Sequence, residues 1–297
     1  MKDAPKPRKI IIPPKAYMNL EFLKARDARV LRILSEYLEP ASRLRYHHVE
    51  DTIVFFGSAR AVSRDEAEKR LAALRQRLAT AAPDPPPQEE ITRAEQQVKL
   101  SRYYEDAVDL SRRIVTWAKT LDEGSKRLVI CSGGGPGIME AANRGAREAG
   151  GVSLGFSISL PFEQQLNTYV PRELAFEFHY FFMRKFWFAY LAKALVIFPG
   201  GFGTCDELFE ILTLSQTDKL SKQIGILLYG SDYWNQVLDF EPMAEWGAIN
   251  AKDLALIQRA DTPSDAFELL RAHLVTHHLE PSTEQEAAAP GIAKTRG

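Results

Sequence analysis

The stretch VIFPGGFGTCDELFE, residues 196–210, passes from a short apolar run through three glycines into an acidic segment of helical character. The apolar run predicts a buried strand, and Gly200, Gly201 and Gly203 predict a tight turn before a helix. The first turn of a helix presents N–H groups and a partial positive charge, which together suit an anion. This stretch therefore predicts a strand, a phosphate-binding turn and a helix.

The same pattern recurs along the chain. Apolar runs alternate with longer segments of helical spacing and cover residues 52–56, 128–131, 153–160, 194–198 and 224–229. This alternation predicts an α/β protein with a Rossmann-like parallel sheet and helices on both faces. Ligands of such sheets bind beyond the carboxyl ends of the strands. The expected site therefore combines the loops of residues 57–60, 132–137 and 199–204.

Three regions are expected along the chain. Residues 1–48 should form a Pro- and Lys-rich tail and a helical arm, because apolar residues recur at helical spacing from residue 17 to residue 38. Residues 49–279 should form the Rossmann-like domain. An insert around residues 61–100 begins with a capping box at SRDE and is broken at PDPPP, residues 83–87. Residues 280–297, rich in Glu, Ala and Pro, are expected to be disordered.

Composition narrows the classes of partner. The 38 basic and 39 acidic side chains give a net charge of −1, which offers no electrostatic argument for nucleic acid or an anionic membrane. No apolar run approaches the roughly 20 residues that span a bilayer. The chain has two cysteines, Cys131 and Cys205, so a framework of structural disulfides is not expected. A cytoplasmic protein without nucleic-acid or membrane partners is expected.

Glu207 has two interpretations at this stage. TCDE, residues 204–207, is itself a capping-box pattern, in which Glu207 would only accept a hydrogen bond from the N–H of Thr204. Alternatively, Glu207 acts on a sugar beside a phosphate that the glycine turn holds. The two roles compete for one carboxylate, so the structure can decide between them.

PGGFGTCDE, residues 199–207, resembles the PGGxGTxxE motif of the LOG family, the cytokinin riboside 5′-monophosphate phosphoribohydrolases. Many members were long labelled lysine decarboxylases. MRK, residues 183–185, resembles the Arg-Lys pair of that family, SGGGPGIM its first glycine turn, and FFGSAR its opening strand and loop. The resemblance covers roughly residues 52–272. The arm and the insert make the chain more similar to a long bacterial subgroup than to the short members.

The resemblance implies hydrolysis of a nucleoside 5′-monophosphate to a free base and ribose 5-phosphate. Glu207 and Arg184 are the implied catalytic residues, because a carboxylate can stabilise an oxocarbenium-like transition state and a guanidinium can hold phosphate, sugar or leaving base. The expected phosphate- and nucleotide-binding residues are Gly200, Gly201, Gly203, Thr204, Lys185, Ser58, Gly133, Gly134 and Gly135. No metal and no cofactor is expected, and no site for pyridoxal phosphate supports a decarboxylase.

Alternatives stay open at this stage. The substrate could be a cytokinin riboside monophosphate, an AMP-like nucleotide or a broader set of purine and pyrimidine 5′-monophosphates. A non-catalytic nucleotide or cofactor carrier on the same fold is a further alternative, in which Glu207 serves only as a cap. The resemblance also implies a homodimer or a larger homo-oligomer. The residues do not indicate which base is preferred.

Overall fold

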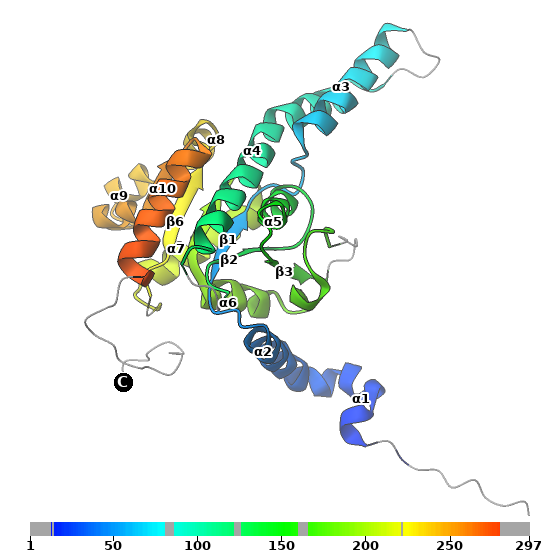
Figure 1. Cartoon of the computed structure of the whole chain (residues 1–297), viewed down its shortest axis with the longest axis vertical. Helices are drawn as coiled ribbons and strands as arrows, with labels where there is room; N and C mark the ends of the chain where they lie inside the picture. The colour runs from blue at the N-terminus through cyan, green and yellow to red at the C-terminus, as the bar shows by residue number, and fades with distance from the viewer. Residues whose placement is uncertain are drawn as a thin grey trace, which may run out of the picture.

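The computed structural model describes residues 13, 15–80, 86–121, 126–159, 166–220 and 222–279. A seven-stranded sheet in the order β4-β3-β2-β1-β5-β6-β7 forms its centre (Figure 1), and every strand pair is parallel. The α/β fold with a Rossmann-like sheet is thus confirmed. The strands are β1 (Thr52–Phe56), β2 (Val129–Ser132), β3 (Ser153–Ile158), β4 (Ala175–Phe178), β5 (Ala192–Ile197), β6 (Gly225–Tyr229) and β7 (Ile257–Ala260).

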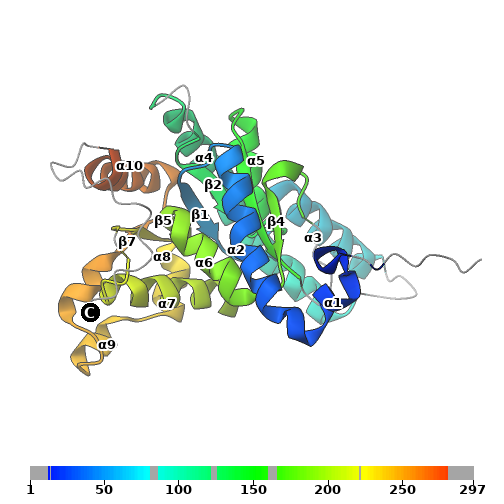
Figure 2. The ribbon, with the colours of Figure 1, turned by 90° about the horizontal axis from the view of Figure 1, so that it is seen from below.

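Helices connect the strands and cover both faces of the sheet (Figure 2). They are α1 (Leu20–Lys24), α2 (Arg29–Tyr46), α3 (Arg64–Ala79), α4 (Gln88–Ala118), α5 (Ile138–Glu148), α6 (Phe181–Leu191), α7 (Phe202–Gln216), α8 (Ser231–Val237), α9 (Glu241–Glu245) and α10 (Pro263–Leu274). Short 3-10 helices span Ala16–Met18, Arg26–Ala28, Arg172–Leu174 and Ala251–Leu256, and a π-helix spans Val275–Leu279. None of the described helices has the length and apolar character needed to cross a membrane.

The central strand β1 is buried at every position, and four of its five residues are apolar. Ile53 and Phe55 pack into the cluster that includes residues of α4, α5 and α10, whereas Val54 and Phe56 pack into the cluster that includes residues of α2, α6, α7 and α8. Successive side chains of a strand point to opposite faces, so a strand covered on both sides favours apolar residues on both faces. The continuous apolar runs of the sequence are the consequence.

The N-terminal arm differs from the single helix expected over residues 17–38. It is divided into short helices followed by α2, which continues to Tyr46. The α2 helix is anchored to the domain: the Glu36 carboxylate accepts hydrogen bonds from the N–H groups of His179 and Tyr180, and the Trp187 indole donates to the Glu36 carbonyl oxygen over 2.9 Å. The arm therefore covers the α6 side of the sheet.

The insert forms a helical hairpin that extends beyond the sheet (Figure 1). Ser63 caps α3 by accepting a hydrogen bond from the Glu66 N–H over 3.4 Å, which confirms the helix start expected at SRDE. The N-terminal half of α4 packs on α3 through a separate apolar cluster of Leu71, Leu74, Ile91 and Ala94. The C-terminal half of the same helix packs on the sheet. One continuous helix thus joins the insert rigidly to the domain.

Some expectations were wrong or lie outside the described residues. The edge strand β7 was not predicted, because IQRA contains only two apolar residues and only Ala260 of the four is buried. The helix expected from Thr204 begins at Phe202. The N-terminal tail up to residue 12, the C-terminal tail of residues 280–297 and most of the PDPPP break fall outside the described residues.

A substitution at the crossing of α4 and α5 tests the packing. A Cβ at Gly145 would lie 2.2 Å from the Val108 carbonyl oxygen, whereas a Cβ at Gly203, which is also inside a helix, would meet nothing within 4 Å. We expect Gly145→Ala to lower the free energy of unfolding by about 2–3 kcal/mol despite the better helix propensity of alanine. Gly203→Ala should stay within about 1 kcal/mol of the native protein. Urea denaturation measures both, and equal effects would contradict the packing described.

Candidate active site

Backbone hydrogen bonds join the three loops that the sequence predicted to form the site. The Ser58 N–H donates to the Pro199 carbonyl oxygen over 2.9 Å, and the Ser58 carbonyl oxygen accepts from the Ile138 N–H over 3.1 Å. The close approach requires glycine at 137, which has a φ of +73° and whose Cβ would lie 2.2 Å from the Ser58 oxygen. The loops after β1, β2 and β5 therefore meet where the strand order reverses, at the β1–β5 pair.

The glycine turn after β5 leads directly into α7. Among the described residues, the N–H groups of Gly201, Phe202 and Gly203 have no acceptor, whereas the Thr204 N–H donates to the Gly201 carbonyl oxygen over 3.0 Å. The Thr204 side chain lies over Gly200, where a Cβ would be 2.1 Å from Oγ1. The turn therefore presents three backbone donors to a ligand, and the N–H of Thr204 is used within the helix instead.

The interpretation of Glu207 as a helix cap is wrong. The N-cap of α7 is Gly201, with no side-chain cap, so Glu207 lies in the second turn of the helix and cannot serve its start. Its side chain is buried, and Oε1 has no hydrogen-bond partner among the described residues. Burial raises the pKa of Glu207 to about 7, although the charges of Lys185 and Arg184 partly oppose the shift. Glu207 is therefore a buried carboxylate that titrates near neutrality.

Arg184 approaches Glu207 from α6. Its Nη2 lies 3.5 Å from Glu207 Oε1, which is an ion pair too long for a strong hydrogen bond. The guanidinium lies 5.2 Å from the Phe181 ring centroid and 5.8 Å from that of Phe188, and its Nε is buried without a hydrogen-bond partner. Burial lowers the pKa of Arg184 despite the neighbouring carboxylates. For both partners desolvation outweighs the mutual attraction. Because Glu207 Oε1 and Arg184 Nε are buried without a hydrogen-bond partner among the described residues, each side chain retains hydrogen-bonding capacity for a ligand.

The pair opens into a cavity of about 630 Å³ at the carboxyl edge of the sheet. This volume lies within the usual range for small-molecule sites. The eleven site residues singled out in the sequence fall into two groups here, eight that line the cavity and three that do not. Those that line the cavity are Ser58, Gly133, Arg184, Gly200, Gly201, Gly203, Thr204 and Glu207. Lys185 does not line it, because its Nζ pairs with Asp206 at 2.8 Å and with Glu210 at 2.7 Å.

Gly134 and Gly135 contribute to the structure of the first glycine turn and do not line the cavity. Their carbonyl oxygens accept hydrogen bonds from the Asn167 side-chain amide over 2.9 and 3.0 Å, and neither glycine is among the residues that line the cavity. Asn167 also donates to the Asn143 side chain over 2.9 Å. The first glycine turn is thereby held by polar side chains behind the site, and only Gly133 reaches the cavity.

Sequence reasoning missed several lining residues. They are Phe56, Met139, Phe188, Cys205, Tyr233 and Val237, whereas Gly57, Ala59, Arg60 and Phe202 also line the cavity and lie in the loops that were expected to form the site. The Tyr233 hydroxyl donates to the Gly200 carbonyl oxygen over 2.6 Å and so supports the glycine turn after β5. Tyr233 follows the carboxyl end of β6, so the rule that selected the other three loops could have found it. Both cysteines are free thiols.

The burial of Glu207 predicts a pH-dependent stability. A carboxyl whose pKa is 4.5 when unfolded and about 7 when folded costs stability as it ionises, so the cost develops between these pH values and is complete above pH 7. Between pH 4.5 and pH 8, native protein should therefore lose up to about 3 kcal/mol of unfolding free energy relative to Glu207→Gln. Urea denaturation at each pH measures this, with the exposed Glu173→Gln as the control. Parallel curves for native protein and Glu207→Gln would refute the raised pKa.

Several known proteins are similar to this chain in sequence. A family model described as "Possible lysine decarboxylase" matches residues 139–270. Cytokinin riboside 5′-monophosphate phosphoribohydrolase LOG3 of Arabidopsis thaliana is 28% identical over 192 residues, which cover 61% of this chain and 80% of that protein. Cytokinin riboside 5′-monophosphate phosphoribohydrolase LOG5 of the same plant is 30% identical over 179 residues, which cover 59% and 73%.

A solved structure, the molybdenum cofactor carrier protein from Chlamydomonas reinhardtii, matches 76% of this chain and 99% of that chain, with 17% identity and a TM-score of 0.44. That similarity is weak. The sequence identity to LOG5 extends over 73% of that protein's length. On this identity, with the PGGFGTCDE motif at the start of α7, the chain belongs to the LOG family.

Proposed function

We propose that this protein hydrolyses the N-glycosidic bond of a nucleoside 5′-monophosphate and releases a free base and ribose 5-phosphate. The observation that carries the proposal is the buried Glu207–Arg184 pair next to a turn with free N–H donors. The names of the relatives support it, since they are phosphoribohydrolases of cytokinin riboside 5′-monophosphate.

The phosphate in this scheme binds at the start of α7. The N–H groups of Gly201, Phe202 and Gly203 donate to its oxygens, and the helix dipole adds to the attraction. Glu207 lies in the second turn of the same helix, and Glu207 and the glycine turn line one cavity. A nucleotide whose phosphate binds the turn therefore has its ribose in the cavity that Glu207 lines.

The chemical step breaks the bond between C1′ and the base nitrogen, and the electron pair leaves with the base. A water oxygen forms the new bond to C1′ and gives up a proton. The ionised carboxylate of Glu207 stabilises the positive charge that develops on the ribose ring and accepts the proton of the attacking water. That proton then passes to the departing base, which leaves as the neutral free base, and Glu207 is ionised again. Arg184 lies on the other side of that carboxylate and hydrogen-bonds the sugar or the departing base.

The proposed substrate is a cytokinin riboside monophosphate or an AMP-like nucleotide, in line with the relatives' names. Apolar side chains that line the cavity, among them Met139 and Phe188, suit the face of a base. A broader purine and pyrimidine nucleosidase is the other outcome of the assay below. The expected homodimer or larger homo-oligomer stays a prediction.

A product assay tests the reaction. AMP, GMP, CMP, UMP and isopentenyladenosine monophosphate are incubated with the protein, and free base and ribose 5-phosphate are quantified. We expect Glu207→Gln to lower kcat by about 10²–10³-fold and Arg184→Ala by about 10²-fold, because each removes charge from the reacting centre. Asp206→Asn, the neighbouring exposed carboxylate, is the matched control and should retain kcat within about threefold.

The outcomes of this assay are distinct. Base release that is lost in Glu207→Gln and retained in Asp206→Asn supports the proposal and identifies the substrate. The absence of release from every nucleotide, by folded protein that binds nucleotide, would favour a carrier. Release that survives in Glu207→Gln would refute the role of Glu207.

The pH dependence of kcat reports the ionisation of Glu207. The ionised carboxylate is the catalytic form, and the pKa of Glu207 in the free protein is about 7, so kcat should rise with pH. The negative charge of the bound phosphate favours the protonated carboxyl, so kcat should level off above an apparent pKa of 7 or higher. Steady-state kinetics from pH 5 to pH 9 measure this. A kcat that falls as pH rises through 7 would instead assign Glu207 the role of a general acid.

A further inference from the structure

A second and larger cleft, of about 1150 Å³, adjoins the cavity of the catalytic pair. Both are lined by Ser58, Gly200, Gly201 and Tyr233, whereas Arg184 and Glu207 line only the first. The two spaces therefore meet at the phosphate turn. When the sugar of a ligand lies at Glu207 and its 5′-phosphate lies on the turn, the second cleft lies beyond the phosphate.

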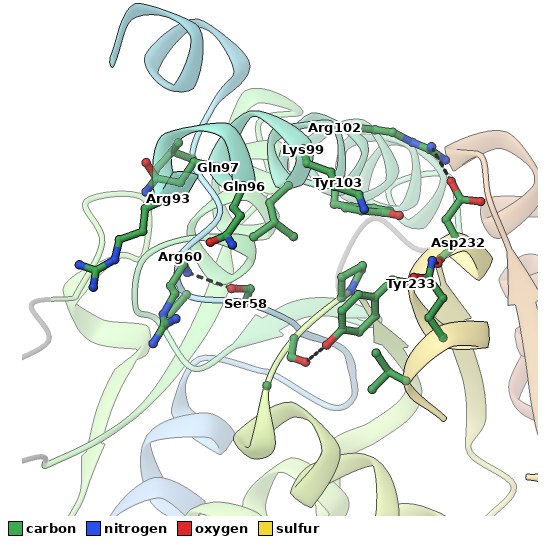
Figure 3. Close-up of a pocket in the computed structure, with 18 of the residues that line it drawn as sticks. Ser58, Arg60, Arg93, Gln96, Gln97, Lys99, Arg102, Tyr103, Asp232 and Tyr233 are labelled. Carbon is green, nitrogen blue, oxygen red and sulfur yellow. Dashed lines mark hydrogen bonds and ion pairs between the residues drawn. The ribbon is translucent and has the colours of Figure 1, made fainter. Parts of the chain in front are cut away.

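The insert supplies the far wall of this cleft (Figure 3). Arg70 comes from α3, and Arg93, Lys99 and Arg102 come from α4. Arg60 follows β1 on the near side. Helix α4 carries its basic residues over the turn because its C-terminal half is buried on the sheet.

The lining is strongly basic. Arg60, Arg70, Arg93, Lys99 and Arg102 face a single acidic lining residue, Asp232, although the chain as a whole has a net charge of −1. Arg102 is balanced by Asp106 at 3.6 Å and Asp232 at 3.5 Å, and Arg93 has an exposed partner, Glu89, at 3.7 Å. Within the described ranges, Arg60, Arg70 and Lys99 have no carboxylate partner. Unpaired cations around a concave surface favour an anionic ligand.

We infer that the cleft is a subsite for a second phosphoryl group, so that the protein accepts nucleoside 5′-diphosphates as well as monophosphates. This inference rests on the proposed function, because it takes the phosphate turn as the 5′ end of the substrate. The first phosphate binds the turn, and the second extends toward Arg70 and Lys99. Water then cleaves the C1′–N bond as before, and the products are the free base, which leaves with the electron pair, and ribose 5-diphosphate.

The test compares mono- and diphosphates of one base, with AMP and ADP as the first pair and the guanine, cytosine and uracil pairs alongside. The double variant Arg70→Gln/Lys99→Gln removes two cleft charges, and Arg75→Gln is the matched control. Arg75 is an α3 residue that pairs with Glu95 at 2.9 Å and does not line the cleft. The quantity measured is the ratio of kcat/KM for the diphosphate to that for the monophosphate.

We expect the double variant to lower this ratio about tenfold, with kcat/KM for the monophosphate unchanged, because only the second phosphoryl group contacts the cleft. Arg75→Gln should leave the ratio unchanged. A ratio that falls less than about threefold, or a monophosphate activity that falls equally, overturns the inference; the latter would place the nucleoside itself in the cleft.

Binding separates failure of the subsite from failure of the proposed reaction. Calorimetric titration of AMP and ADP is made on Glu207→Gln protein, with and without the two cleft substitutions, in the absence of divalent cations. Tighter binding of ADP that the cleft substitutions abolish supports the subsite even if no nucleotide is cleaved. Equal binding of ADP to both proteins overturns it even if monophosphates are cleaved.

Discussion

The backbone of Ser58 is the point on which the site depends. Its N–H group holds the turn after β5, and its carbonyl oxygen holds the first turn of α5. Both bonds form because β1 lies between β2 and β5 in a parallel sheet, so that the three carboxyl ends lie next to one another. Without this junction, the glycine turns would be ordinary connections between strand and helix.

Burial of the Glu207–Arg184 pair follows from that arrangement. Helix α7 starts at the turn after β5, and α6 ends where β5 begins, so the two helices that flank β5 bring the two side chains together. Neither side chain has its hydrogen bonds completed by the protein. Such groups cost free energy in the unliganded protein, and a ligand that satisfies them recovers it. The raised pKa of Glu207 and the open cavity are two results of this one arrangement.

The insert changes what lies beyond the glycine turn after β5. Its two helices have their own small apolar cluster, so they can extend from the sheet without weakening the main core. Because α4 runs without interruption from the insert into the domain, the basic residues of its first half are held at a constant distance from the turn. A flexible loop with the same charges would not form a cleft of defined shape.

The sequence by itself determined most of the sheet and the two glycine turns, because apolar runs and glycines mark them within short stretches. Its resemblance to the LOG family, not local spacing, selected Arg184 and Glu207. Strand β7 escaped prediction because IQRA contains only two apolar residues, and Tyr233 because the loop after β6 was not included in the expected site. The role of Glu207 could not be decided from TCDE alone, since a cap and a free carboxylate share that pattern.

Only the tertiary structure decided which residues share the cavity. It turned Lys185 toward Asp206 and Glu210, placed Gly134 and Gly135 behind the site, and set Arg70 and Lys99 beside a turn about 100 residues or more away in sequence. The reason is physical. Burial, ion pairing and cleft shape depend on groups that are distant in the chain and close in space, and no local pattern encodes those distances.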